Sequence, residues 1–245
     1  MNIGIIGAGQ IGATLARKLS VAGNTVQLAD ARGAKAIKLI AEEAGAVAVA
    51  VAEAAKNVEV LIVSIPTKGI PDLPKDLFDK ASHDLIVVDT GNYYPGMRDD
   101  PIAAIEGGMP ESQWVSEQLG RPVVKAFNSL LAYSLANKGL PAGTKGRIAM
   151  SVSGDDPRAK KIVIELVDAV GFDGIDAGKL ADSWRHQPGT PAYCVDLEAN
   201  PLRRALSAAD REKAPQLRDL ALQKMGQLGE GFTNDDLLNI NRSLH

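Results

Sequence analysis

Ile3-Gly4-Ile5-Ile6-Gly7-Ala8-Gly9-Gln10-Ile11-Gly12 runs from a short apolar segment through a G-x-G-x-x-G turn into an amphipathic segment. A strand before such a turn and a helix beginning inside it form the context in which the three glycines bind a dinucleotide. Gly7 then permits the tight turn, Gly9 lets the backbone approach a pyrophosphate, and Gly12 lets the helix pack on the strand. The helix N-terminus adds amide donors. We therefore predict dinucleotide binding by Gly7, Ala8, Gly9, Gln10, Ile11 and Gly12; the alternative is a glycine turn in a fold that has lost its nucleotide.

The first 130 residues alternate β-branched runs with Ala-rich amphipathic segments, which predicts parallel strands joined by helices. Strands are expected at Asn2–Ile6, Thr25–Ala29, Val58–Ser64, Leu85–Asp89 and Pro122–Ala126, with a weaker one near Ala46–Val49. Helices are expected at Ile11–Ala22, at Ala34–Ala44 and, more briefly, near Ala52–Lys56. Continuously apolar strands suit a sheet that is covered on both faces. The predicted fold class is α/β, with a Rossmann-type, doubly wound and mostly parallel sheet.

The pattern changes after Asn128 and predicts a smaller C-terminal α/β unit with a helical tail. Its elements are a helix at Leu130–Asn137, a strand at Arg147–Ser153, a helix at Pro157–Val170, a short strand at Gly171–Asp176, and amphipathic helices at Asp210–Leu228 and Asn234–Leu244. Asn234 is the expected N-cap of the last helix. We divide the chain into a dinucleotide-binding domain, residues 1–140, and a region for substrate contacts and oligomerisation, residues 141–245.

The composition excludes several classes of function. The 245 residues include 27 Lys+Arg and 30 Asp+Glu, for a formal charge of −3, and form no dense basic stretch. Neither a nucleic acid nor a membrane is therefore an expected partner. One cysteine and three histidines without ligand spacing predict no metal site. The start of the chain lacks the features of a signal peptide, and no apolar run approaches the roughly 20 residues that span a bilayer, so we expect a cytoplasmic location.

The segment Ala29-Asp30-Ala31-Arg32-Gly33-Ala34-Lys35 gives opposing indications of which dinucleotide binds. Asp30, 18 residues after Gly12, would accept hydrogen bonds from ribose hydroxyls and repel a 2′-phosphate, which favours NAD. Arg32, with Lys35 behind it, would clamp that phosphate, which favours NADP. The alternatives are a turn residue at Asp30 and a solvated helix start at Arg32 and Lys35.

Together with three further segments, the opening motif resembles the family of NADPH-dependent reductases of the deazaflavin coenzyme F420, bacterial relatives of undefined substrate included. These segments are Ala29-Asp30-Ala31-Arg32-Gly33, Val123-Val124-Lys125-Ala126-Phe127-Asn128 and Trp184-Arg185-His186-Gln187-Pro188-Gly189-Thr190-Pro191-Ala192-Tyr193. The resemblance extends to about residue 195, beyond which the chain resembles only the bacterial branch. It implies an oxidoreductase that transfers hydride between NADP(H) and a flavin-like, F420-like acceptor or another small one.

The resemblance has one departure, in the segment that sets cofactor specificity. In the family this segment usually reads Ala-Asn-Ser-Arg-Gly or Gly-Ser-Arg, and the hydroxyl and the arginine hold the 2′-phosphate. Here Asp30 replaces the amide and Ala31 replaces the serine, while Arg32 is retained. Because Arg32 with Lys35 can outweigh one carboxylate, we expect NADP, with NAD as the alternative.

Hydride transfer between two planar rings needs walls that hold the rings face to face more than it needs acids or bases. In an open parallel sheet these walls are loops at the carboxyl ends of the strands. The residues expected around the nicotinamide are Ser64, Ile65, Pro66, Thr90, Asn92 and Asn128. Asn128 is expected to donate to the acceptor ring or to hold the carboxamide, with a helix N-cap as the alternative, and the same holds for Asn92.

Four further side chains are candidates for the substrate side. Tyr93 and Tyr94 are expected to stack against the acceptor, unless they form a core pair. The prolines of Trp184–Tyr193 favour an extended course over a helix. Within this segment we expect Arg185 to bind an anionic tail of the acceptor and His186 to act as a proton donor. The alternative is a structural loop that clamps the second unit onto the sheet.

Two other functions are compatible with the sequence. A β-hydroxyacid or imine dehydrogenase shares the first motif, but it has a long helical C-terminal domain, which the strand-like Arg147–Ser153 disfavours. A redox sensor that binds NAD(P) without turnover is the second. The apolar stripes of the tail need to be buried, which favours a homodimer. No motif identifies the acceptor or the direction of hydride flow.

Overall fold

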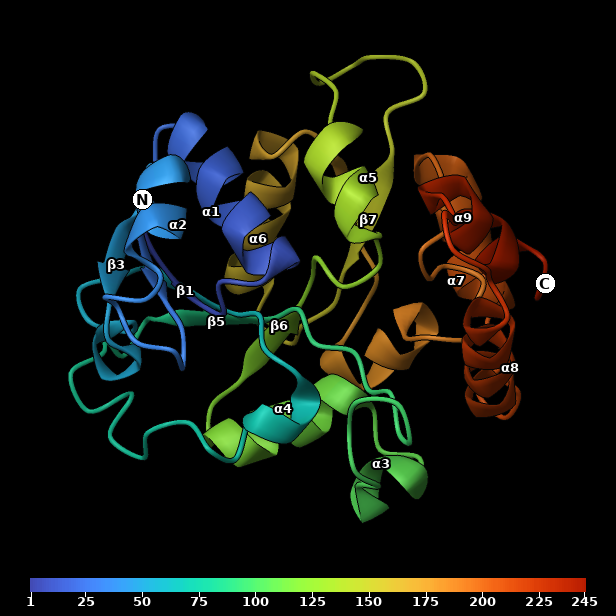
Figure 1. The fold of residues 1–245 in the computed structure, drawn as a ribbon, viewed down its shortest axis with the longest axis horizontal. Coiled ribbons are helices and arrows are strands. Elements are labelled where there is room, and N and C mark those ends of the chain that lie inside the picture. The colour runs from blue at the N-terminus through green and yellow to red at the C-terminus, as the bar shows by residue number, and fades with distance from the viewer.

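A sheet of six parallel strands forms the centre of the computed structural model, which describes residues 1–245 (Figure 1). The strands are β1 (Asn2–Ile6), β2 (Thr25–Ala29), β3 (Val47–Val49), β4 (Val60–Val63), β5 (Ile86–Asp89) and β6 (Val123–Lys125). Their order in the sheet is β3-β2-β1-β4-β5-β6, so the direction of winding reverses between β1 and β4. This is the strand order of a doubly wound Rossmann fold, and the predicted fold class is confirmed.

The central strands are buried on both sides, as their continuous apolar sequences predict. Ile3 of β1 lies opposite Val26 of β2 and Val60 of β4. All four residues of β4 are buried. A strand without a solvated face is expected where helices cover both faces of a parallel sheet.

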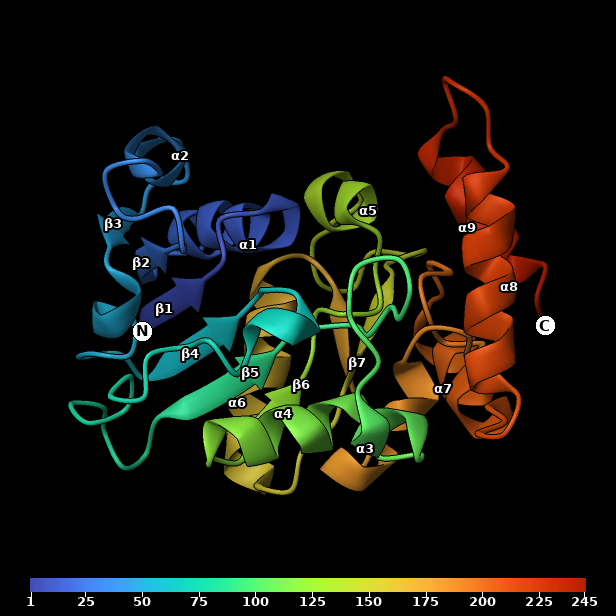
Figure 2. The same cartoon turned by 60° about the horizontal axis from the view of Figure 1, so that its bottom comes forward.

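Two helical layers cover the sheet, above and below it in Figure 1, and Figure 2 shows one helix of each, α1 above the sheet and α4 below it. The helices of the first layer are α1 (Gln10–Val21), α2 (Lys38–Glu43), α5 (Ala132–Asn137) and α6 (Pro157–Ala169), whose buried residues share one core cluster with β1. The second layer contains α3 (Ala103–Glu106) and α4 (Glu111–Leu119), which share a second cluster with β4 and β5. Short 3-10 turns, η1 (Val51–Glu53) and η2 (Thr67–Gly69), follow β3 and β4.

Several local predictions need correction. The helix predicted from Ala34 begins at Lys38, after a run of turns that starts behind Gly33, where φ is +88°. The short helix predicted near Ala52–Lys56 forms only the 3-10 turn η1. Trp184–Tyr193 is not extended at its start, because a 3-10 helix, η3 (Leu180–His186), runs into it. Proline restricts the chain only from Pro188 onward, after this helix has ended.

A second, two-stranded parallel sheet of β7 (Ala149–Val152) and β8 (Asp173–Asp176) follows, as predicted for this part of the chain. The two sheets are joined where Lys125, the last residue of β6, pairs with Ser153 through reciprocal backbone hydrogen bonds of 2.8 and 3.0 Å. Met150 and Phe172 belong to the same core cluster as Ile3. The two parts of the chain therefore share one buried core, and the division at residue 140 stays a prediction.

The helical tail consists of α7 (Ala199–Ala208), α8 (Ala214–Gly226) and α9 (Asn234–Arg242), grouped at one side of the molecule (Figure 1). The N-cap of α9 is Thr233 rather than the predicted Asn234: Thr233 and Asp236 form a capping box in which each side chain accepts the other's backbone N–H. Leu202 of α7, Ala221 of α8 and Leu238 of α9 are buried within this chain. No helix is long and apolar enough to span a membrane.

Candidate functional site

The G-x-G-x-x-G turn lies where β1 ends and α1 begins, beside the reversal of the strand order. Gly7 has a φ of +111°, and a Cβ atom there would lie 2.1 Å from the carbonyl oxygen of Ser64. A Cβ atom at Gly12 would lie 1.9 Å from the carbonyl oxygen of Gly7. The fold itself therefore requires glycine at these two positions.

Gly9 differs from its two neighbours in the motif, because a Cβ atom there would meet nothing within 4 Å. Gly9 is also the N-cap of α1, where no side chain caps the helix and no acidic residue occupies the first turn. The first amide groups of α1 thus have no side-chain cap, and Gly9 and Gln10 beside them are exposed. Unpaired amides and the positive end of the helix dipole fit a pyrophosphate at this turn.

Asp30 closes one side of the turn. Its Oδ2 accepts the backbone N–H of Ala8 at 2.8 Å, and Arg32 Nε donates to its Oδ1 at 2.7 Å. Arg32 Nη2 also donates to Oδ2, at 3.2 Å. The Arg32 guanidinium lowers the pKa of Asp30 to about 2, so the carboxylate is ionised at neutral pH. The two residues with opposing indications for NAD and NADP therefore bind each other.

Arg32 remains accessible despite this ion pair, with 54% of its side chain exposed. Its Nη2 lies 3.4 Å from the carbonyl oxygen of Ala8, so the guanidinium lies over the glycine turn. Ala31 and Lys35 are exposed. The structure thus brings Asp30 and Arg32 to the turn and leaves Lys35 at the surface beside them.

The loops after β4 and β5 lie at the same edge of the sheet as the glycine turn, where the parallel strands end. The N–H of Ser64 donates to Ile6 at 2.8 Å, while Ile65 is half-buried and Pro66 is exposed. The hydroxyl of Thr90 is buried and donates to the carbonyl of Val63 at 3.3 Å. The Thr90 hydroxyl thus has a partner within the protein.

Asn92 and Asn128 face each other across the ends of β5 and β6. Asn92 Nδ2 donates to the Asn128 carbonyl at 3.0 Å, and Asn128 Nδ2 donates to Asn92 Oδ1 at 3.1 Å. Asn128 Nδ2 also donates to the carbonyl of His186 at 2.8 Å. Asn128 is not the N-cap of α5, because that cap is Leu131. Phe127, just before it, is buried with a φ of +60°, a strained conformation that re-aims the chain at the end of β6.

His186 lies behind Asn128, fully buried. Its Nδ1 is 3.1 Å from Asn128 Oδ1, and its Nε2 is 2.9 Å from Ser153 Oγ. Burial and the nearby Lys125 charge lower the pKa of His186 to about 3. A ring that stays neutral and away from solvent does not fit the predicted role of proton donor near neutral pH. Sequence reasoning missed Ser153, whose hydroxyl completes this chain of contacts.

The two tyrosines occupy different environments, and the expectation that both form a stacking wall is not met. Tyr93 is fully buried in the second core cluster, where its hydroxyl donates to Glu106 at 2.8 Å. Tyr94 is half-buried, and its hydroxyl contacts that of Tyr193. Arg98 lies over the Tyr94 ring, 5.3 Å from its centroid. Tyr94 therefore remains a candidate for the substrate side, and Tyr93 is a core residue.

A buried ion cluster under the loop after β5 was not predicted. Lys125 is fully buried; its Nζ donates to Asp89 Oδ2 at 3.2 Å and to the carbonyl of Gly91 at 2.6 Å. Glu111 Oε2 lies 3.5 Å from Lys125 Nζ, and burial raises the pKa of Glu111 to about 7. A lysine in an apolar strand carries no signal of these partners, since Asp89 and Glu111 come from other elements.

Arg185 lies apart from the loops at the ends of β4 to β6. Its guanidinium covers the Trp184 ring at 4.6 Å and donates to the carbonyl of Leu206 on α7 at 3.2 Å. It lines a cavity of about 450 Å³ with Arg203 and Asp176. Its predicted contact with an anionic acceptor stays a prediction, and no contact in the structure joins it to Asn128 or Tyr94.

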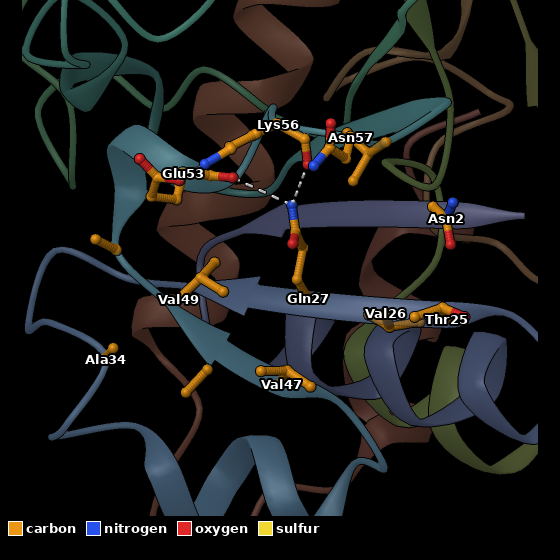
Figure 3. A pocket seen from close by; sticks show the side chains of 13 residues that line it. Asn2, Thr25, Val26, Gln27, Ala34, Val47, Val49, Glu53, Lys56 and Asn57 are labelled. Carbon is orange, nitrogen blue, oxygen red and sulfur yellow. Dashed lines mark hydrogen bonds and ion pairs between the residues drawn. The ribbon is translucent and has the colours of Figure 1, made fainter. Parts of the chain in front are cut away.

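A large cavity lies elsewhere, along β2 and β3 at the edge of the sheet (Figure 3). It has a volume of about 640 Å³ and contains none of the predicted site residues. Gln27 crosses it and donates to the carbonyls of Glu53 and Lys56 at 3.2 and 3.1 Å. The short turn η1 covers less of this sheet face than a crossover helix would, which leaves the surface hollow.

The sequence is similar to a known protein family and to a curated protein. Residues 2–93 match the family model described as NADP oxidoreductase coenzyme F420-dependent. YjhV of Escherichia coli (strain K12) is 40% identical over 106 residues, which cover 43% of this chain and 77% of YjhV.

Two solved structures are also similar. The hypothetical protein SMa0349 from Sinorhizobium meliloti is 31% identical with a TM-score of 0.69, and the match covers 81% of this chain and 96% of that one. A candidate F420-dependent NADP-reductase from Arthrobacter sp. FB24 is 23% identical with a TM-score of 0.60, over 74% of this chain and 86% of that one. The last similarity shows a common fold.

Proposed function

The chain belongs to the family of F420-dependent NADP oxidoreductases, and from this we propose that it transfers hydride between NADP(H) and a small planar acceptor of the flavin or deazaflavin type. The observation that carries the proposal is the open space at Gly9, beside the uncapped start of α1 and under the exposed guanidinium of Arg32. A turn that served only the fold would not need glycine at this position, since the structure leaves room for a side chain there. The residues present therefore fit a dinucleotide.

The dinucleotide supplies the hydride, and the chain supplies the surfaces that hold and shield it. In this proposal the first amides of α1 bind the pyrophosphate, and Ile65 and Pro66 line one side of the nicotinamide site. On the loop after β5, Asn92 lines the other side of the nicotinamide site and Tyr94 meets the acceptor. His186 takes no part in proton transfer, because it is buried and neutral.

The Asp30–Arg32 ion pair supports a preference for NADP with NAD accepted. Arg32 neutralises much of the charge that Asp30 would present to a 2′-phosphate, and its exposed guanidinium can bind that phosphate. With NAD, the ionised Asp30 can accept a ribose hydroxyl in place of one arginine bond. Both cofactors are thus accommodated, and the phosphate adds a charge-assisted contact.

The reaction is tested by mixing the purified protein with NADPH or NADH and then adding oxidised F420, FMN or FAD. We expect oxidation of the nicotinamide with at least one of these acceptors, faster from NADPH than from NADH. A protein that binds NADPH and oxidises it with none of them would contradict the proposed acceptor class. Failure to bind either dinucleotide would contradict the proposed function as a whole.

Two further properties belong to this proposal. A cytoplasmic location suits the reduced nicotinamide pool that such a reaction uses. A homodimer remains our proposal, although the buried stripes of α7, α8 and α9 pack within one chain. Leu220 and Phe232 of the tail are 40% and 56% exposed and provide the apolar surface for it. Sedimentation analysis of the purified protein distinguishes a dimer from a monomer.

A further inference from the structure

A chain of hydrogen bonds runs from Ser153 through His186 and Asn128 to Asn92. Counting the donors and acceptors that each amide already uses shows which of them can still bind a ligand. Asn128 carries two N–H donors on its amide, and both are used, by Asn92 Oδ1 and by the carbonyl of His186. Its Oδ1 faces His186 Nδ1. Asn128 is also only 2% exposed. Its two N–H donors therefore cannot serve a ligand without giving up a contact inside the protein, and its remaining oxygen lone pair belongs to a side chain that is closed to solvent.

Asn92 has capacity left over. Its Nδ2 donates once, to the Asn128 carbonyl, and its Oδ1 accepts once, from Asn128 Nδ2. One N–H donor and one oxygen lone pair remain on the same amide, and Asn92 is only half-buried. A primary carboxamide of a ligand, which carries both donors and an acceptor, can pair with either of these free groups. Among the ligands of an NADP oxidoreductase, the nicotinamide ring carries that group.

The backbone around Asn92 is fixed as firmly as its side chain. Its carbonyl accepts the hydroxyl of Thr67 at 3.2 Å and also contacts the guanidinium of Arg98. Thr67 follows β4, and Asn92 itself follows β5. Ligands of open parallel sheets bind outside the carboxyl ends of the strands near the reversal of strand order, so Asn92 stands at the expected edge.

We propose that Asn92 binds the carboxamide of the nicotinamide ring, and that Asn128, His186 and Ser153 are positioning residues that fix the orientation of the Asn92 amide. This inference rests on the proposed function. It replaces the predicted role of Asn128 as a direct ligand and gives His186 a role that does not depend on proton transfer.

The neutral state of His186 gives this chain one consistent arrangement. Asn128 Oδ1 can only accept, so the proton of the imidazole is on Nδ1, and Nε2 accepts the hydroxyl of Ser153. A protonated ring would offer a donor at Nε2 and force the hydroxyl to turn. Burial, with the Lys125 charge nearby, lowers the pKa of His186 and keeps the neutral form. The amides of Asn128 and Asn92 are therefore held in one orientation.

Binding of two nucleotides separates the nicotinamide contact from the rest of the site. NADP⁺ carries the nicotinamide, and 2′-phospho-ADP-ribose is the same molecule without it. We expect Asn92→Ala to weaken NADP⁺ binding by about tenfold and to leave 2′-phospho-ADP-ribose binding unchanged. Asn239→Ala, on the exposed surface of α9, is the matched control and should change neither. Equal effects of Asn92→Ala on both nucleotides, or no effect on either, would overturn the proposal.

Two His186 variants test the positioning role. In His186→Asn the amide retains a donor that can reach Asn128 Oδ1, whereas His186→Leu removes it. We expect His186→Leu to lose the tighter binding of NADP⁺ over 2′-phospho-ADP-ribose, and His186→Asn to keep most of it. Equal losses in the two variants would show that the imidazole only fills space. If the wild-type protein binds neither nucleotide, the proposed function fails; if it binds both equally, only this inference fails.

Discussion

The two halves of the candidate site are built in different ways. On the nucleotide side, the backbone of Gly7, Gly9 and Gly12 forms the surface, and Asp30 and Arg32 lie within two residues of each other. On the nicotinamide side, Asn92, Asn128 and His186 come from segments 36 and 58 residues apart and meet through buried hydrogen bonds. A site formed by backbone geometry is local in sequence, while one formed by side chains depends on the complete fold.

The two halves of the site also differ in how much of their side chains is exposed to solvent. Arg32 is half exposed, whereas Asn128 and His186 are 2% and 0% exposed. We therefore expect substitutions on the nucleotide side to change affinity while the fold persists, except where glycine is needed for packing. On the nicotinamide side, substitutions of buried residues should change stability as well as binding.

The largest effect is expected from Gly12→Ala. Its Cβ atom would lie 1.9 Å from the backbone oxygen of Gly7, and a backbone atom cannot move aside as a flexible side chain can. We expect a loss of at least about 3 kcal/mol in the free energy of unfolding, measured by denaturant titration. Gly9→Ala, whose Cβ atom would meet nothing within 4 Å, is the control and should lose no more than the ~1 kcal/mol expected for alanine at an N-cap. Equal stability of the two variants would contradict the assigned packing role of Gly12.

The second effect is a pH dependence that comes from Glu111. Burial raises its pKa from 4.5 to about 7, so its contribution to stability is complete below pH 4.5 and is lost as the pH rises through 7. Glu111→Gln removes this dependence. Between these pH values, the wild type should lose up to roughly 3 kcal/mol relative to the variant. Parallel stability profiles for the two proteins would show that the carboxyl group does not titrate in this range.

The third effect is a change in the preference between NADP and NAD, caused by loss of the Asp30–Arg32 ion pair on the nucleotide side. Asp30→Ser removes the carboxylate that competes with a 2′-phosphate for Arg32. We expect the ratio of NADP to NAD affinity to rise by an amount on the order of 1–2 kcal/mol, measured by calorimetry. Asp76→Ser, at an exposed position, serves as the control. An unchanged ratio in Asp30→Ser would remove Asp30 from the cofactor site.

The smallest effect is expected from Lys35→Ala. Lys35 is exposed, and contacts between exposed charges are weak because water and salt screen them. NADP binding should weaken by about twofold at low salt, and NAD binding should not change. Salt should reduce the difference between Lys35→Ala and the wild type. A larger loss that persists at high salt would place Lys35 in direct contact with the phosphate.

The contrast between the local glycine turn and the side chains that meet only in the complete fold also explains which features the sequence could predict. The six-stranded sheet and the glycine turn follow from short-range periodicity and spacing, so they were predicted with small errors in bounds. The mutual binding of Asp30 and Arg32 was not, because the sequence lists both residues without showing that they face each other. Tyr93 and Tyr94 are adjacent in sequence, yet one is in the core and the other lies at the site. The burial of Lys125, His186 and Ser153 depends on tertiary contacts that no local pattern encodes.

The most direct test of this account is a calorimetric titration of the wild-type protein and of Gly9→Ala with NADPH. The account predicts one binding site per chain in the wild type, and at least about tenfold weaker binding in Gly9→Ala, because the added methyl group would occupy the open space beside the start of α1. Gly9→Ala should stay folded, with a loss of at most ~1 kcal/mol in stability, so the weaker binding would report on the ligand site. Equal affinities of the two proteins, or no binding by the wild type, would contradict the central claim that the glycine turn holds a nicotinamide dinucleotide.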